Sequence, residues 1–253
     1  MTVQEIYGKL CERIPEELRE GWDNDGLMCA SDDSLEVRRA LVTLDVTEEI
    51  VDYAVANDID LIVSHHPLIF KPIGAVTEDL HISRKVIKLI KNDIAVISLH
   101  TRADKVQGGV NDILCDMLSI RDAEPFGEGF IGRIGTLDEE LDLEDFSYLV
   151  KDILECDGVR VADACIPVQR VAVVGGDGKD FVRDALAMGA DTLVSGRLSY
   201  NVMEEANEMG INLIEAGHFF TEQPVTAFFQ SLLMRLDHNM YIEIRNSNVI
   251  KLI

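Results

Sequence analysis

The chain has 253 residues, 47% of them hydrophobic, so it can bury a sizeable core as one large domain or two small lobes. Its formal net charge of −23 opposes binding to nucleic-acid phosphate and to anionic membrane surfaces. No apolar stretch approaches the roughly 20 residues that span a bilayer, and no basic-then-apolar leader opens the sequence. The cysteines are scattered and include no C-x-x-C pair, which is typical of reduced thiols. We therefore expect a cytoplasmic protein that binds neither nucleic acid nor membrane.

The first predicted element is a short amphipathic helix. Thr2 and Glu5 are spaced as a capping box, and Val3, Ile6 and Leu10 form one apolar face. The segment Trp22-Asp-Asn-Asp-Gly-Leu27 then holds the only tryptophan. Its turn-forming residues fit either a plain turn with an aromatic anchor or a loop that lines a site.

A β-α-β unit follows. Residues 39–45 predict a strand, and Thr47 caps a helix that runs to about Asn57. The apolar run 59–63 predicts a second, fully buried strand that ends at His65-His66-Pro67, because proline cannot continue the ladder. Both histidines are therefore expected at the carboxyl end of a strand, where ligands collect in open α/β sheets.

The next strand ends in the same way. Residues 83–91 predict a helix, and residues 94–99 predict a strand that stops at His100-Thr-Arg-Ala-Asp104. Polar side chains thus again follow an apolar run. Gly108-Gly109 then leads into a helix expected over residues 110–118.

The pattern loosens between residues 124 and 167, where we place the boundary between two lobes, 1–124 and 125–253. Glycines punctuate an antiparallel strand predicted over residues 130–136, and residues 143–154 predict a helix.

After Pro167 the chain repeats itself at an offset of 131. Residues 39–45 align with residues 170–176, and Asp60-Leu-Ile-Val-Ser64 aligns with Asp191-Thr-Leu-Val-Ser195. The repeat predicts an α/β fold of two pseudo-symmetric β-α-β-α-β lobes packed together, with a metal site between them at the strand carboxyl ends. Gly196-Arg197 stands where the first half has its two histidines, so the second half must supply ligands elsewhere.

Those ligands are expected in Glu215-Ala-Gly-His-Phe-Phe-Thr-Glu222, which follows the last repeated strand. If Thr221 and Pro224 open a helix, His218 and Glu222 can converge on one point. Neutral imidazole and ionised carboxylate are ligands of borderline divalent ions. No cysteine lies among the candidate residues, which argues against a zinc-finger type of site. The candidate residues all fall at strand ends: His65, His66, His100, Asp104, His218 and Glu222. His81 and His238 flank helices and are expected to face solvent.

Four motifs together carry a resemblance that spans nearly the whole chain. They are Trp22-Asp-Asn-x-Gly-Leu27, Ser64-His-His-Pro-Leu-Ile-Phe70, His100-Thr-x-x-Asp104 with Gly108-Gly-Val-Asn111, and Gly217-His-x-x-Thr-Glu222. The chain resembles the dinuclear-metal-centre family known as GTP cyclohydrolase 1 type 2 homologues, or NIF-three-like proteins. It is similar to the short form, which lacks an inserted domain near residue 125.

The resemblance implies two divalent metal ions per chain, of zinc, iron, manganese or nickel. It assigns His65 and Asp104 to one ion, His66 and His218 to the other, and Glu222 as the bridge. His100 would lie beside them as a catalytic or substrate-facing group. The family also forms ring-shaped hexamers, so the resemblance implies a homohexamer. The chain departs from the family at Arg102, where asparagine is usual, and this adds a fixed positive charge.

Two functions follow as hypotheses. A pair of ions about 3.5–4 Å apart can activate water and clamp a leaving oxygen, so the first is a metal-dependent hydrolase of a nucleotide-like or phosphorylated small molecule. The second is a metal-stabilised oligomeric scaffold that turns over nothing. Arg102 and Arg197 could meet phosphate or could be solvated surface arginines. Residues 175–179 could cradle phosphate, although the pattern better fits a tight strand-to-helix turn.

Overall fold

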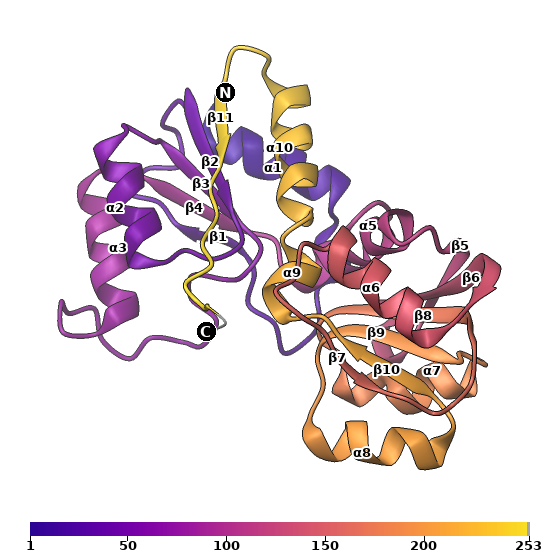
Figure 1. Ribbon diagram of the computed structural model, residues 1–253. Helices are drawn as coiled ribbons and strands as arrows, with labels where there is room; N and C mark the ends of the chain where they lie inside the picture. The colour runs from indigo at the N-terminus through magenta and orange to yellow at the C-terminus, as the bar shows by residue number, and fades with distance from the viewer. Residues whose placement is uncertain (252–253) are drawn as a thin grey trace. The chain divides into compact units, whose positions relative to one another are not determined.

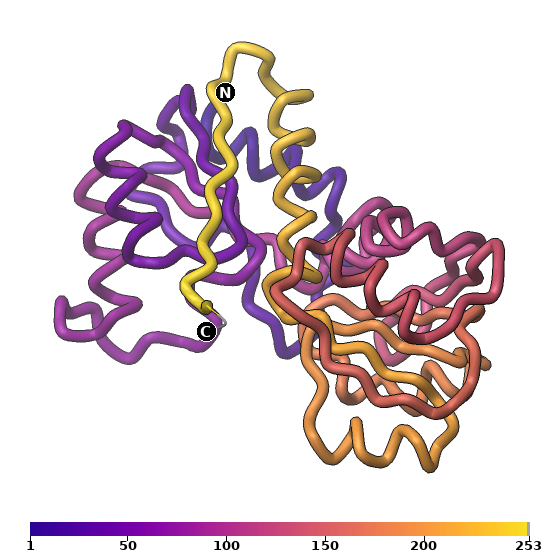
Figure 2. Tube along the Cα trace, viewed as in Figure 1, coloured from indigo at the N-terminus to yellow at the C-terminus, as the bar shows by residue number. Residues whose placement is uncertain are grey.

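The computed structural model describes residues 1–251, which pack into two compact units. Unit 1 comprises residues 1–106 and 225–251, and unit 2 comprises residues 107–224. These units divide the chain at other positions than the predicted lobes, because the segment after Pro224 joins the first sheet. Figure 2 shows this yellow segment ending beside the indigo and purple strands of unit 1.

Unit 1 is built on a five-stranded sheet in the order β1-β4-β3-β2-β11. Its strands are β1 (Gly26–Cys29), β2 (Arg39–Thr43), β3 (Leu61–Ser64), β4 (Ala95–Ser98) and β11 (Tyr241–Ile244). All neighbours are parallel except β1, which runs antiparallel to β4. Every residue of β3 and β4 is buried, as expected for central strands of a parallel sheet covered on both faces.

Helices cover both faces of this sheet. They are α1 (Val3–Arg13), α2 (Glu48–Ala56), α3 (His81–Lys91), α4 (Thr101–Lys105), α10 (Val225–Leu236) and the 3₁₀ turn η1 (Glu16–Leu18). Figure 1 shows α2 and α3 together on one face and α1 with α10 on the other. The predicted capping box at Thr2 is present, and Thr47 caps α2 by accepting a hydrogen bond from the backbone N–H of Ile50 at 3.2 Å.

Unit 2 is built on a six-stranded sheet in the order β5-β6-β8-β9-β10-β7. Its strands are β5 (Arg121–Phe126), β6 (Gly132–Leu141), β7 (Arg160–Ala162), β8 (Val168–Asp177), β9 (Thr192–Arg197) and β10 (Asn212–Glu215). The three strands β8, β9 and β10 are parallel, and the others join antiparallel at the edges.

Alternate residues of β8 feed two separate cores in unit 2. Val171 and Val173 pack in one core with Leu114, Phe146 and Val150, which lie on α5 (Val110–Met117) and α6 (Leu143–Ile153). Ala172 and Val174 pack on the opposite face with residues of α7 (Val182–Ala187) and α8 (Tyr200–Met209). The remaining helical segments of unit 2 are α9 (His218–Glu222), η2 (Glu128–Phe130) and η3 (Lys179–Phe181).

The predicted α/β fold with an internal repeat is confirmed in detail. Ala40 pairs with Leu61 in the first sheet and Val171 pairs with Thr192 in the second, so both partners keep the offset of 131. The Asp60 carboxylate accepts the backbone N–H groups of residues 38 and 39, both at 2.8 Å. Asp191 does the same for residues 169 and 170, at 2.9 and 2.6 Å. The repeat thus extends from the topology to a side-chain contact at the start of the two corresponding strands, β2 and β8.

Within residues 1–251, none of the helices combines the length and the apolar character that a membrane crossing needs.

Candidate metal centre

His65 and His66 follow β3 directly, and each ring is held through its Nδ1 atom. The Nδ1 atom of His65 lies 2.9 Å from the backbone oxygen of Leu99, and that of His66 lies 2.7 Å from Oδ1 of Asp45. Both partners are oxygen atoms that only accept, so each Nδ1 must carry the proton and donate it. When either ring is neutral, its lone pair is therefore on Nε2, which is the arrangement found in metal-binding histidines.

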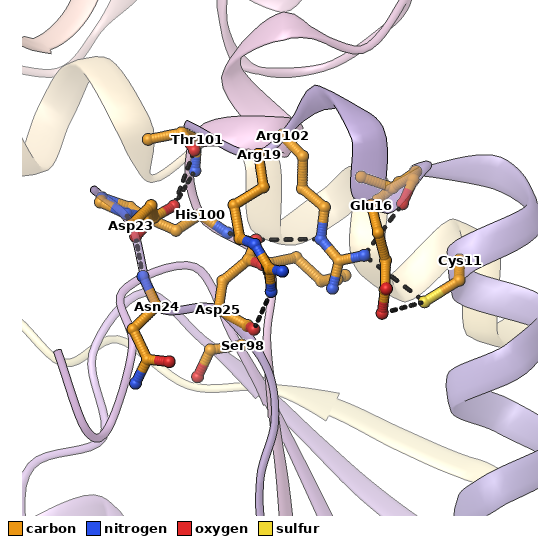
Figure 3. Close-up of polar contacts among 12 residues, drawn as sticks. Cys11, Glu16, Arg19, Asp23, Asn24, Asp25, Ser98, His100, Thr101 and Arg102 are labelled. Carbon is orange, nitrogen blue, oxygen red and sulfur yellow. Dashed lines mark hydrogen bonds and ion pairs between the residues drawn. The ribbon is translucent and has the colours of Figure 1, made fainter. Parts of the chain in front are cut away.

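His100 follows β4 and is held in the same tautomer. Its Nδ1–H donates to Oδ1 of Asp23 at 2.8 Å, and the other oxygen of Asp23 accepts the N–H and the hydroxyl of Thr101 at 3.1 and 2.7 Å (Figure 3). Burial alone would raise the pKa of Asp23, but the hydrogen bonds from His100 and Thr101 lower it to about 2. Burial alone would lower the pKa of His100, yet its hydrogen bond to Asp23 and the charge of Asp104 raise it overall.

These three rings gather at one edge of the sheet of unit 1. One nitrogen from each of His65, His66 and His100 lies within 4.8 Å of the others. The short helix α4 starts immediately after His100 and brings Oδ1 of Asp104 to 3.6 Å from Nε2 of His65. Two ligand atoms that share one tetrahedral ion at metal–nitrogen distances near 2.0–2.1 Å are about 3.4 Å apart. Asp104 and His65 therefore fit as ligands of one divalent ion.

Unit 2 contributes a second pair of candidate ligands. Gly217, at φ 91°, turns the chain at the end of β10, and the helix α9 begins at His218. Nε2 of His218 and Oε2 of Glu222, one helical turn apart, are 3.0 Å from each other. The helix start predicted at Thr221 was wrong, because the glycine in a left-handed conformation starts the turn earlier.

A bulge at Gly175-Gly176, within the last residues of β8, turns the backbone and makes room for this pair. Gly176 has φ 69°, and a Cβ atom there would lie 2.3 Å from Oε1 of Glu222 and 3.3 Å from Cε1 of His218. The N–H of Gly176 donates to the hydroxyl of Thr221 at 3.2 Å, which ties the turn to α9. The glycines therefore allow close approach of β8 to the helix that carries His218 and Glu222. They do not form a phosphate cradle of the strand-to-helix type, because β8 continues to Asp177 and the next α-helix starts only at Val182.

Both predictions about Arg102 were wrong. The side chain is fully buried, its Nε–H donates to Oδ2 of Asp25 at 2.9 Å, and its Nη1 donates to the backbone oxygen of Ile14 at 3.2 Å (Figure 3). It is a structural arginine of the core of unit 1. Arg197 is exposed and lies 4.0 Å from a carboxylate oxygen of Asp177.

The carboxylates that orient the histidines were absent from the sequence-based candidates. Asp45 was the last residue of the predicted strand 39–45, so the strand-end rule that selected the histidines also applied to it. Asp23 lay in the quoted tryptophan motif, but nothing in its neighbourhood pointed to a contact with His100, 77 residues away. His81 and His238 are exposed, as expected.

Comparisons with known proteins agree over the whole chain. The family model described as Duf34/NIF3 (NGG1p interacting factor 3) matches residues 1–252. A Clostridium perfringens protein named GTP cyclohydrolase 1 type 2 homolog is 37% identical over 232 residues, which cover 89% of this chain and 88% of that protein. A Clostridium acetobutylicum protein of the same name is 31% identical over 250 residues, covering 96% and 93%.

Solved structures agree with the fold. A Bacillus cereus protein related to NIF3 matches with a TM-score of 0.91 at 25% identity, over 100% of this chain and 99% of that chain. Reduced HcgD from Methanocaldococcus jannaschii matches with a TM-score of 0.85 at 25% identity, over 96% and 97%.

Proposed function

Because this chain belongs to the Duf34/NIF3 family, we propose that it binds two divalent metal ions and hydrolyses a nucleotide-like or otherwise phosphorylated small molecule. The observation that carries the proposal is the shared tautomer of His65, His66 and His100. All three rings donate through Nδ1, so each neutral ring presents its lone pair on Nε2. Histidines that only formed hydrogen bonds at strand ends would not need to share this orientation, and here three of them share it at one edge of the sheet.

The proposed ligand set joins the candidates of both units, as the motif resemblance implies. His65 and Asp104 hold one ion, His66 and His218 hold the other, and Glu222 bridges them. The chemistry of the set, imidazole with carboxylate and without thiolate, suits zinc, iron, manganese or nickel. When bound, such ions supply Lewis acidity that polarises a phosphoryl or carbonyl oxygen.

His100 is the proposed proton carrier. Its Nδ1–H remains bonded to Asp23, so only Nε2 is available to take a proton from the attacking water or to return one to the leaving group. Asp23 keeps its negative charge at neutral pH, because its pKa is about 2, and so stabilises the imidazolium that forms.

The bridging role of Glu222 gives the first test. Glu222→Ala is expected to reduce the content of both ions, whereas His65→Ala is expected to reduce mainly one, as measured by elemental analysis of protein purified without chelator. Glu208→Ala is the matched control, since this glutamate is exposed on α8. Full metal content in the Glu222 variant would contradict the bridging assignment.

Activity is tested separately on the intact protein, by screening nucleotides and sugar phosphates for hydrolysis before and after metal removal. Hydrolysis that disappears with the metal and returns on its addition supports the enzyme. Two equivalents of metal with no hydrolysis of any probe would overturn the enzymatic part and favour the metal-stabilised oligomeric scaffold.

A further inference from the structure

Unit 1 carries an aromatic corner, which we define as the side chains of Trp22, Phe70 and His100. The ring centroids of Trp22 and Phe70 are 6.2 Å apart, those of Trp22 and His100 are 6.3 Å apart, and those of Phe70 and His100 are 6.0 Å apart. The three planes cross at 74°, 79° and 86°. The rings therefore meet as three nearly perpendicular walls, one of which belongs to the candidate metal centre.

The two apolar side chains of the corner are exposed to solvent. Trp22 is 62% exposed and Phe70 is 41% exposed. A single exposed apolar side chain is ordinary on a protein surface, but two large aromatic rings in mutual contact beside a histidine form a patch that water covers poorly. Such a patch indicates a binding site when the surrounding chain fixes its position instead of burying it.

The chain does hold this patch in place. Asp23 and Asp25, which follow Trp22, have completely buried side chains and bind the start of α4. Asp23 accepts from His100 and Thr101, and Oδ2 of Asp25 accepts the backbone N–H of His100 at 3.0 Å. The side-chain amide of Asn24 donates to the backbone oxygen of Ile69, the residue before Phe70. The loops of Trp22 and Phe70 are thus fixed to each other and to His100 before any ligand arrives, which lowers the entropic cost of binding.

We propose that the aromatic corner binds a planar heteroaromatic ring of the substrate, so that Trp22 and Phe70 determine specificity at the proposed hydrolase site. This inference rests on the proposed function and adds a ring-bearing substrate class to it, a nucleoside or nucleotide rather than a sugar phosphate. Aromatic faces bind planar rings by offset stacking. His100 forms the third wall, so a ring in the corner lies beside the group that carries the proton.

A second copy of the chain fits the corner less well. Stable interfaces bury about 1,200–2,000 Å² in total, far more than two aromatic side chains supply. A single-stranded nucleic acid, which also stacks on aromatic rings, is opposed by the net charge of −23. A small molecule with one or two rings matches the size of the patch.

Trp22 is the only tryptophan of the chain, so the corner can report its own occupancy by fluorescence. Guanosine and adenosine are titrated into the intact protein, with ribose 5-phosphate and inorganic phosphate as ring-free probes. The expected result is a saturable quench by the nucleosides and none by the ring-free probes. Phe70→Leu is expected to weaken nucleoside binding about 5- to 150-fold, which is the effect of losing one stacked ring.

Control variants separate stacking from general damage. Phe70→Tyr keeps the ring and is expected to restore binding. Tyr148→Leu removes an aromatic ring that is 58% exposed on α6 and is expected to leave binding unchanged. Trp22→Leu, followed by isothermal titration calorimetry, is expected to show the same loss as Phe70→Leu. The absence of a saturable quench, or full affinity in the Phe70→Leu variant, would overturn the proposal.

The two proposals fail in different ways. Two equivalents of metal with no nucleoside binding would overturn the aromatic corner and leave the metal-dependent hydrolase standing. Nucleoside binding that depends on Phe70 in protein that takes up no metal would support the corner and overturn the metal centre. If Trp22→Leu changed the mass in sedimentation velocity but left nucleoside affinity intact, the corner would be an interface between copies, contrary to the proposal.

Discussion

The carboxylate of Asp45 shows how a residue outside the proposed ligand set can orient a proposed ligand. Its Oδ1 accepts the Nδ1–H of His66 at 2.7 Å, and its Oδ2 accepts the hydroxyl proton of Ser247 at 3.1 Å. This pairing fixes the ring orientation of His66 and increases the basicity of Nε2.

Asp45→Asn is expected to weaken metal binding about 10- to 100-fold without loss of the fold, because the amide cannot supply the carboxylate charge. Competition with a coloured chelator measures the affinity. Asp32→Asn, at an exposed aspartate whose carboxylate accepts hydrogen bonds from Ser34, is the control and should leave the affinity unchanged. Equal affinities for wild type and Asp45→Asn would mean that His66 is not a ligand.

Asp23 makes a pH-dependent contribution to the stability of metal-free protein. Its pKa is about 2 in the folded chain against an ordinary value of 3.8, so its stabilising effect is present above pH 4 and is lost as the pH falls through about 2. Asp23→Asn is therefore expected to lower the free energy of unfolding by about 2 kcal/mol at pH 7, from a shift of this size.

Urea unfolding at a series of pH values tests this dependence. The difference between wild type and Asp23→Asn should narrow between pH 4 and pH 2, because the wild-type carboxyl takes up its proton first in the unfolded state and then in the folded state. A constant difference across that range would show that the loss comes from packing rather than from the charge.

At the level of single residues, the sequence located the candidates that follow a recognisable strand. His65, His66 and His100 follow apolar runs and could be selected for that reason. Arg102 could not be interpreted correctly, because its partner Asp25 lies 77 residues away and only the folded chain brings their charges together. An arginine is most often solvated, and burial requires a partner that no local pattern reveals.

At the scale of elements, the turned end of β8 at Gly176 and the short helix α9 depend on each other for their fit. A methyl group on Gly176 would collide with the carboxylate of Glu222, as the 2.3 Å distance from the added Cβ shows. The turn can therefore be altered without touching any proposed ligand.

Gly176→Ala is expected to reduce metal content as strongly as Glu222→Gln, because the collision displaces the carboxylate. Gly210→Ala is the matched control, since Gly210 has φ 75° and an added Cβ there would meet nothing within 4 Å. Both substitutions strain a left-handed position, so only the collision differs. If elemental analysis found equal metal loss in both variants, backbone strain would explain it.

The repeated elements were predictable, and the edges of the sheets were not. Strands 39–43 and 61–64 and their counterparts in unit 2 carry dense β-branched runs bounded by turn residues, so periodicity located them. The strand β11 is four residues long and half-exposed, and it pairs with β2 at a sequence distance of about two hundred residues. Local patterns carry no information about such a pairing, and the C-terminal segment was consequently assigned to the second lobe.

At the scale of the whole molecule, unit 1 is completed by residues that follow unit 2 in the sequence. Tyr53 of α2 donates to the carboxylate of Glu243 at 2.8 Å, and the backbone N–H of Asp45 donates to the hydroxyl of Ser247 at 3.1 Å. The C-terminal segment thus supports the carboxylate that orients His66.

Removal of residues 240–253 is expected to leave β2 as an exposed edge and to destabilise unit 1 selectively. Hydrogen exchange should show lost protection in β2 and β3 and retained protection in β8 and β9. Truncation after Lys251 removes no part of β11 and serves as the control. Uniform loss of protection across both sheets would show that the units do not unfold independently.

The split composition of unit 1 also orders events on the ribosome. The continuous segment 107–224 emerges from the exit tunnel before α10 and β11 do, so unit 2 can reach its final contacts while the sheet of unit 1 still lacks an edge strand. His66 gains its complete support only after Ser247 has been added to the nascent chain. The order of synthesis therefore also orders folding. His218 and Glu222 can reach their positions in unit 2 first, and the edge of unit 1 that carries the histidines is completed last.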